Sequence, residues 1–511
     1  MLTKFLKLRF DLVFFYLFVF LLPLEKKHVF IAKALDLSTN YSPWEAIEIY
    51  LTDIVFGLVL LFWLINLLVQ NPISDHIEFE IAQHPTQRWT KLKLYKNPVF
   101  LLLSGFFLVA IISTIQEGIT NLEVYHLTKL AEYFMIFIYT VLNIDTIVKL
   151  LYIIIIFIFS SFFQAILGIL QYLSQHSYNL KIFGEVDLTP QAQNVAKIVV
   201  DGEKYIRAYG TLPHANILGG YLFVGSIFAF MLILLIILFF ARNNEQNINN
   251  KPIFANKNPQ KLFHVEQSLF FRLFRLYYNY LLVIFSFIFA LLFLGLIFSF
   301  SRSAWLAFIF VIIFLLINFT KSFINFFKKD YKKIWPILIL FVFITISLAT
   351  FFPQIKAKTS HTDQYGDESV AGRFEYTKTS LKMVKKSPFF GIGYGNFTIK
   401  LAGFSQKPLQ WWQFQPVHNI YLLILSETGI LGLLFFLGFI GYVFYLGIKA
   451  IKNIGNSIQR LVIISFFAIF SGLIIIGFFD HYLWDIQQGS LLFWLISGIS
   501  LSSLIQTSFK I

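Results

Sequence analysis

Long apolar stretches recur along the chain and limit its fold more than any other feature. Runs of about 18 or more residues, long enough to cross a ~30 Å hydrocarbon core as helices, occupy 52–70, 98–115, 150–172, 214–240 and 280–300. None of them alternates with a period of two, which excludes a β-barrel. The 511 residues are 57% hydrophobic and only 13% charged, unlike a soluble globular protein. The sequence therefore predicts an all-α polytopic membrane protein.

Polar breaks between the apolar runs predict about twelve transmembrane helices. Their expected ranges are 9–24, 52–70, 98–115, 127–143, 150–172, 214–240, 280–300, 304–320, 335–352, 418–448, 461–478 and 489–508. We expect N-terminal transmembrane helices in residues 1–200 and a transmembrane core in residues 201–500. Within this core, 241–279 is expected to be a cytoplasmic insert and 353–417 a large extracytoplasmic loop containing short helices.

The distribution of lysine and arginine indicates the orientation of the chain. If the N-terminus, with Lys4, Lys7 and Arg9, lies in the cytoplasm, the loops on that side carry most of the positive charge. The loop 353–417 is also basic, but long loops are translocated largely regardless of charge. We therefore expect a multi-pass protein of the cytoplasmic (inner) membrane with both termini in the cytoplasm.

The net charge of +14 and the absence of cysteine exclude further classes of partner and site. In a membrane protein, excess positive charge usually anchors cytoplasmic loops at anionic lipid, so we expect the lipid bilayer and no nucleic acid as a partner. Without cysteine, the chain has no disulfide, thiolate nucleophile or cysteine-based metal site.

In the predicted orientation, the unusual polar residues of the second half all face the extracytoplasmic side. They are Arg207 in RAYGTLPHAN, Arg302 in SRSAW, Arg373 in AGRFEY, His418 and Asn419 in PVHNIY, and Asp480 and His481 in FFDHYLWD. Independent segments would rarely share one face by chance. This face is the predicted functional site.

Two arginines are candidate ligands for an anion. Arg302 interrupts about forty apolar residues where only a very tight turn fits, and a guanidinium so close to the bilayer needs a carboxylate or phosphate partner. The alternative is an arginine that extends to the lipid headgroups. Arg373 stands at the start of a predicted loop helix, and alone it would be a solvated surface residue. Together the two can clamp a diphosphate without a metal, so we expect no metal and no cofactor.

His418 lies where the longest polar loop meets an apolar segment, and the near-neutral pKa of histidine suits proton transfer there. In the alternative interpretation, His418 and Asn419 only begin the next helix, with Asn419 as its N-cap. Asp480, His481 and Asp485 are expected to orient His418 or contact the acceptor, or else they are ordinary loop residues. Between Arg373 and His418, the segment PFFGIGYGNF predicts a tight glycine turn rather than a nucleotide-binding loop.

The segments SRSAW, AGRFEYTKTSLKMVKKSPFFGIGYGNF and PVHNIYLLILSETGILGLLFFLGF resemble the signature of the O-antigen ligase and O-antigen polymerase superfamily, which includes the WaaL, Wzy and PglL kinds. The resemblance runs from about Arg207 to Asp485 and is strongest over 297–440. It implies a metal-independent, inverting glycosyltransferase that moves a glycan from a polyprenyl diphosphate carrier to an acceptor hydroxyl on the extracytoplasmic face. The acceptor would be a glycan, a lipid or a protein.

The resemblance also assigns roles to the predicted site. Arg302 and Arg373 would bind the diphosphate, and His418 would act as base on the acceptor or assist at the reacting centre. The expected substrate contacts are Arg207, Asn419, Asp480 and His481. The motifs do not choose between a ligase and a Wzy-type polysaccharide polymerase. A lipid-linked glycan transporter or flippase is a second alternative, but it would need a polar lining in the inner half of the bundle, where ionisable residues are few.

Overall fold

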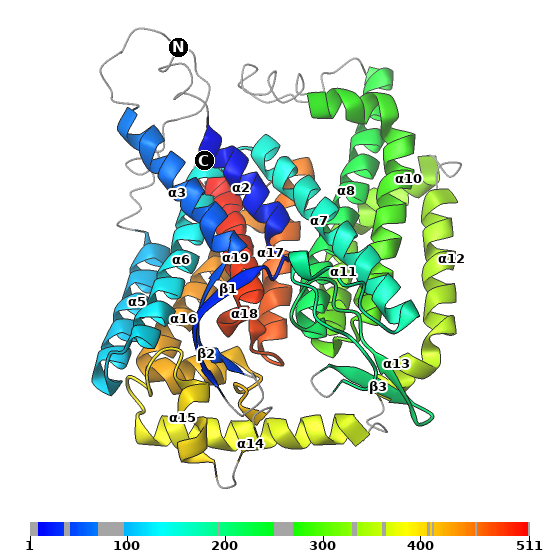
Figure 1. Ribbon diagram of the computed structural model, residues 1–511. Coiled ribbons are helices and arrows are strands. Elements are labelled where there is room, and N and C mark those ends of the chain that lie inside the picture. Colours follow the sequence, from blue (N-terminus) through cyan, green and yellow to red (C-terminus); the bar gives the residue numbers. More distant parts are fainter. Residues whose placement is uncertain are drawn as a thin grey trace.

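The computed structural model describes residues 9–34, 41–69, 97–192, 195–249, 269–329, 335–359, 364–405, 409–410, 413–454 and 457–508. Each of the twelve predicted ranges overlaps one long helix. These helices are α2 (Phe10–Leu21), α3 (Leu51–Val69), α5 (Pro98–Glu117), α6 (Asn121–Asn143), α7 (Ile147–Ser174), α8 (Ala215–Asn249), α10 (Leu269–Phe298), α11 (Arg302–Lys329), α12 (Trp335–Thr350), α16 (Ile420–Asn453), α17 (Ser457–Gly477) and α19 (Gln487–Ser508). The predicted all-α polytopic membrane fold is confirmed (Figure 1).

Nine helices among the described residues are long and apolar enough to cross a bilayer individually. The other three helices that overlap predicted ranges do not meet this test, each for a local reason. α2 has only 12 residues, α6 carries Glu123, Lys129 and Glu132 in its first half, and α12 is bent by 64° against the short helix α13 (Phe352–Thr359). Part of the predicted insert, 250–268, lies outside the described residues, and 269–279 form the start of α10.

Two antiparallel hairpins were not predicted. The first, β1 (Lys27–Ala34) and β2 (Tyr41–Tyr50), joins α2 to α3 and lies inside the outline of the bundle (Figure 1). The second, β3 (Lys197–Val200) and β4 (Glu203–Ile206), turns at Asp201-Gly202, where both residues have positive φ. An Asp-Gly pair suits such a turn because glycine and aspartate tolerate the left-handed region. The strand β4 delivers the chain directly to Arg207.

The large loop contains short helices, as predicted, and lies at the end of the bundle opposite the start of α2 and the end of α19 (Figure 1). Its main helix, α14 (Gln364–Lys386), runs across that end, followed by α15 (Phe397–Phe404). We had expected the loop helix to begin at Arg373. It begins nine positions earlier, so Arg373 lies in mid-helix, where its side chain can reach the bundle below.

The glycine-rich segment after α14 docks into a break in α16, which was predicted to be a single helix. At Gly429 the backbone leaves helical geometry, with φ 66° and ψ −170°. The freed backbone groups find partners in the loop, since Ile430 N donates to Pro388 O (2.8 Å) and Ile392 N donates to Ser426 O (2.9 Å). Non-helical backbone at membrane depth is tolerated where protein satisfies it in this way. The break therefore fastens the loop to the bundle.

Two glycines let the buried helix α8 pack closely against neighbouring segments. A Cβ on Gly219 would lie 2.6 Å from Ser301 Cβ, and one on Gly220 would lie 2.2 Å from the Tyr482 hydroxyl oxygen. Only glycine allows both close approaches. α8 thereby brings the turn between α10 and α11 close to the segment that follows α17.

Candidate functional site

The turn before Arg302 is as tight as its sequence predicts. Only Ser299, Phe300 and Ser301 join α10 to α11, and Phe300 adopts a positive φ of 46°. Arg207, which is 5% exposed, donates from Nε to the Ser299 carbonyl oxygen at 2.7 Å. Arg207 thus holds the turn that places Arg302 at the first position of α11.

A chain of hydrogen bonds connects this turn to Asp480. Arg207 donates to the Asn216 side-chain oxygen, and Asn216 Nδ2 donates to Asp480 Oδ2 at 2.6 Å. Asp480 Oδ1 in turn accepts from the His481 backbone N–H at 3.0 Å. The predicted residues Arg207, Asp480 and His481 therefore belong to one buried polar network.

His418 lies against His481, with ring centroids 5.0 Å apart and ring planes at 82°. Its other neighbour is Tyr376 on α14, whose ring is nearly parallel at 6.1 Å. His418 Nδ1 is buried and has no hydrogen-bond partner among the described residues. An unpaired imidazole nitrogen in an otherwise packed site is available to accept a proton.

Asp485 orients His481 rather than His418. Its carboxylate lies 2.8 Å from His481 Nδ1 and also accepts from Trp44 Nε1 at 3.3 Å. Although burial lowers the pKa of His481, the contact with Asp485 raises it above the ordinary value. The carboxylate thus favours the charged imidazolium beside His418.

Asn419 caps α16. Its side-chain oxygen accepts from the backbone N–H groups of Tyr421 and Leu422 at 3.0 Å, and its Nδ2 donates to the Phe478 carbonyl oxygen at 3.1 Å. This is the geometry of the capping alternative. The amide ties the start of α16 to the end of α17, which sets the position of His418.

Arg373 comes from α14 and is partly buried, and its Nε has no hydrogen-bond partner among the described residues. The charge of Arg373 affects the pKa values of other residues at the site. Burial is the main cause that lowers the pKa of Arg207 to about 10, and the charges of Arg302 and Arg373 add to it against the effect of Asp480. The three arginines predicted from the sequence therefore lie within electrostatic range of one another.

The same field acts on His418. Burial is the main cause that lowers its pKa to about 3, and the charges of His481 and Arg373 act in the same direction, against Asp480. Burial would raise the pKa of Asp480, but the charges of His481 and Arg373 lower it below the ordinary value. The site therefore combines a neutral His418 with an ionised Asp480 and several cations.

Three long helices also begin at this site. α8 starts at Ala215, α11 at Arg302 and α16 at Ile420, each beside one of the residues above. Helix N-termini carry partial positive charge and attract anions. Among the described residues, no group of three or more His, Cys, Asp or Glu side chains is placed to hold a metal ion.

Some site residues were missed or misassigned at the level of sequence. Tyr376 follows Arg373 by three positions on α14. This spacing puts the two side chains on one helical face, so Tyr376 could have been found. Trp44, 441 positions from Asp485, has no comparable local signal.

Residues 287–437 match the family model described as O-Antigen ligase. The matched segment contains Arg302, Arg373 and His418, whereas Arg207, Asp480 and His481 lie outside it. No curated protein matched the chain.

Proposed function

Because its residues 287–437 make this chain a member of the O-antigen ligase and O-antigen polymerase superfamily, we propose that it is a membrane glycosyltransferase with a polyprenyl diphosphate-linked glycan as donor. The acceptor is a hydroxyl group on a glycan, a lipid or a protein. The reaction forms a bond between the acceptor oxygen and the anomeric carbon. The bond from that carbon to the diphosphate breaks, and its electron pair leaves with the diphosphate.

One observation carries this proposal: an unpaired imidazole nitrogen lies among several arginines. Arg302 and Arg373 bind the diphosphate and stabilise the negative charge that grows on it as the sugar departs. Such stabilisation contributes several kcal/mol where water is excluded. His418 Nδ1 accepts the proton of the acceptor hydroxyl, a step that typically contributes ~10² to 10⁴ in rate.

The donor itself makes His418 a stronger base. In the free site, burial and the charges of His481 and Arg373 keep the pKa of His418 at about 3. A bound diphosphate offsets the charge of Arg373, which raises this pKa from its low value. His418 then gains basicity only when the leaving group is in place. The acceptor hydroxyl is therefore deprotonated only when a donor is bound.

The orientation of the chain agrees with an extracytoplasmic reaction. α2 begins and α19 ends at the end of the bundle opposite α14 (Figure 1), so both termini belong on one side of the membrane. The excess of lysine and arginine in the loops on that side assigns it to the cytoplasm. The site then faces the outside of the cytoplasmic membrane.

Transfer by the purified protein in lipid nanodiscs tests the proposal. Donor and candidate acceptors are supplied together, and the products are separated by mass. A glycan on a non-carrier acceptor identifies a ligase, and longer carrier-linked chains identify a Wzy-type polymerase. Full activity in both Arg373→Ala and His418→Ala would reject the assigned roles. Movement of the carrier across a liposome membrane with its glycan unchanged would instead identify a transporter.

A further inference from the structure

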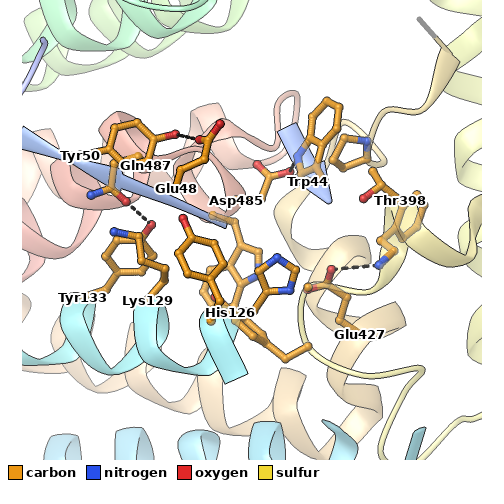
Figure 2. A pocket seen from close by; sticks show the side chains of 16 residues that line it. Trp44, Glu48, Tyr50, His126, Lys129, Tyr133, Thr398, Glu427, Asp485 and Gln487 are labelled. Carbon is orange, nitrogen blue, oxygen red and sulfur yellow. Dashed lines mark hydrogen bonds between the residues drawn. The ribbon is translucent and has the colours of Figure 1, made fainter. Parts of the chain in front are cut away.

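A cavity of about 90 Å³ lies next to the candidate site (Figure 2). Its walls come from β2, α6, the glycine-rich segment with α15, α16 and α18 (Tyr482–Asp485). Two lining residues join it to the site. Asp485 holds His481, and Pro416 precedes His418 by two positions. The cavity is therefore one side chain away from the proposed base.

The lining combines aromatic rings with hydrogen-bonding groups. Its tryptophan and tyrosine residues are Trp44, Tyr50, Tyr125, Tyr133, Tyr394 and Trp484. The C–H faces of a pyranose are apolar and pack on such rings, while its hydroxyl groups need donors and acceptors nearby. Glu427 and Asp485 supply oxygen acceptors to the same lining as His126 (Figure 2). This lining fits a sugar better than a lipid tail.

Two buried polar atoms of the lining have no hydrogen-bond partner among the described residues. They are the indole N–H of Trp484, which is 3% exposed and lies near the Glu427 carboxyl group, and Nδ1 of His126. About 90% or more of buried polar groups in proteins are hydrogen-bonded. The hydroxyl groups of a bound ligand would supply the missing partners.

The charge of the cavity is opposite to that of the candidate site. Glu48, Glu427 and Asp485 line it, and Lys129 is the lysine among the lining residues. Lys129 is already paired with Asp53 at 2.6 Å and with Glu132 at 2.8 Å. Glu48 is paired with Lys27 at 3.1 Å and Asp485 with His481 at 2.8 Å. In these ion pairs the four carboxylates, Glu48, Asp485, Asp53 and Glu132, outnumber the three cations, Lys27, Lys129 and His481. None of the three arginines of the candidate site is among the lining residues.

We propose that this cavity is the acceptor subsite, and that it takes the hydroxyl-bearing edge of a neutral or amino sugar and disfavours an acidic sugar. The inference rests on the proposed transferase function and names its acceptor class. A buried water needs ~10 to 15 Å³ of such cavity volume, so the cavity has room for several ligand atoms, such as one edge of a pyranose, rather than for a longer chain. Its acidic lining keeps the anionic donor on the arginines. β2 and α6, outside residues 287–437, thereby contribute to acceptor choice.

Binding without donor tests the cavity separately from catalysis. The full-length protein in nanodiscs is titrated with methyl glucoside, glucosamine and glucuronate, and tryptophan fluorescence reports binding because Trp44 and Trp484 line the cavity. We expect glucuronate to bind at least ~10-fold more weakly than the other two. Equal affinity for the three sugars would overturn the proposal.

Two variants and a matched control complete the binding test. Thr398→Phe fills the cavity and should abolish binding. Glu48→Gln keeps an oxygen for the Tyr50 hydroxyl but removes the charge, so it should reduce the discrimination against glucuronate. Trp63→Phe changes a buried tryptophan of α3 away from the cavity and should bind like the parent. Unchanged discrimination in Glu48→Gln would overturn the electrostatic part even if Thr398→Phe fails to fold.

Transfer assays with glycosides of the same three sugars separate the two proposals. Transfer that favours glucoside and glucosaminide, with an acceptor KM raised in Thr398→Phe and an unchanged donor KM, supports both. Transfer that is indifferent to the acceptor's charge and to Thr398→Phe overturns the subsite and leaves the transferase intact. Sugar binding with no transfer to any acceptor overturns the transferase and leaves a sugar-binding cavity.

Discussion

His481 meets His418 edge to face, with ring centroids 5.0 Å apart, and Asp485 holds His481 from the other side at 2.8 Å. The carboxylate favours the charged form of His481, and that charge disfavours protonation of His418. The pair therefore separates into one cationic and one neutral imidazole. This division of protonation states leads to the first two predictions.

The acid limb of turnover should move when donor binds. His418 must be neutral to act as base, so activity is lost as pH falls below its pKa. With a free-site pKa of about 3, kcat/KM for the donor should stay constant to about pH 4. The acid limb of kcat should lie at higher pH, since bound diphosphate raises the pKa. Coincident limbs in the two profiles would contradict donor-dependent activation.

Asp485→Asn should move the acid limb of turnover in the same direction as donor binding, through His481. Without the carboxylate, the pKa of His481 falls, so His481 is charged only at lower pH and no longer disfavours protonation of His418 near neutral pH. We expect the acid limb of kcat/KM for the donor to move to higher pH, with little change in turnover at pH 7.5. The control is Asp187→Asn, which removes only an exposed ion pair with Lys181. A uniform loss at every pH would show that Asp485 has only a structural role.

Arg207→Ala should destabilise the protein more than Arg302→Ala. Removing Arg207 leaves the Ser299 carbonyl and the Asn216 side-chain oxygen without a donor in a buried setting, at a cost of ~1 to 3 kcal/mol for each. Arg302→Ala should instead abolish transfer with a smaller change in the midpoint of thermal unfolding. Equal unfolding midpoints for Arg207→Ala and Arg302→Ala would contradict the larger structural role of Arg207.

Arg373→Lys tests whether the site needs the shape of the guanidinium or only its charge. Lysine keeps the charge but cannot bind a diphosphate with two parallel hydrogen bonds. We expect a donor KM raised ~10-fold in the lysine variant and loss of transfer in Arg373→Ala. The donor KM is measured at saturating acceptor. Parent-like kinetics in Arg373→Lys would leave charge as the sole requirement.

Gly429→Ala should loosen the large loop from the bundle. Its φ of 66° lies in the left-handed region, and an added Cβ would lie 2.3 Å from the Phe389 carbonyl group. Strain of ~1 to 3 kcal/mol for the backbone alone should lower the unfolding midpoint. Gly441→Ala, in the same helix with nothing within 4 Å of its Cβ, should be neutral or slightly stabilising. Similar midpoints in both variants would contradict the role of the break.

Much of the fold follows from the sequence because the bilayer imposes its own length scale. A helix must bury about 20 apolar residues to cross it, so the twelve predicted ranges each find a helix. A charged residue between two such runs must lie in the loop that joins the two helices. The turn before Arg302 was predictable since two apolar runs leave only a few residues between them.

What the tertiary structure alone decided is which distant side chains meet. Trp44 reaches Asp485 across 441 positions, and Ser113 donates to the Glu427 carbonyl across 314. Neither pairing has a period or a motif, because each depends on how helices pack after insertion. The sequence determined the helices, their order and a set of polar residues suited to an anion. Packing of α8, α14 and α16 determined that His418 faces His481, and that an acidic cavity lies behind Asp485.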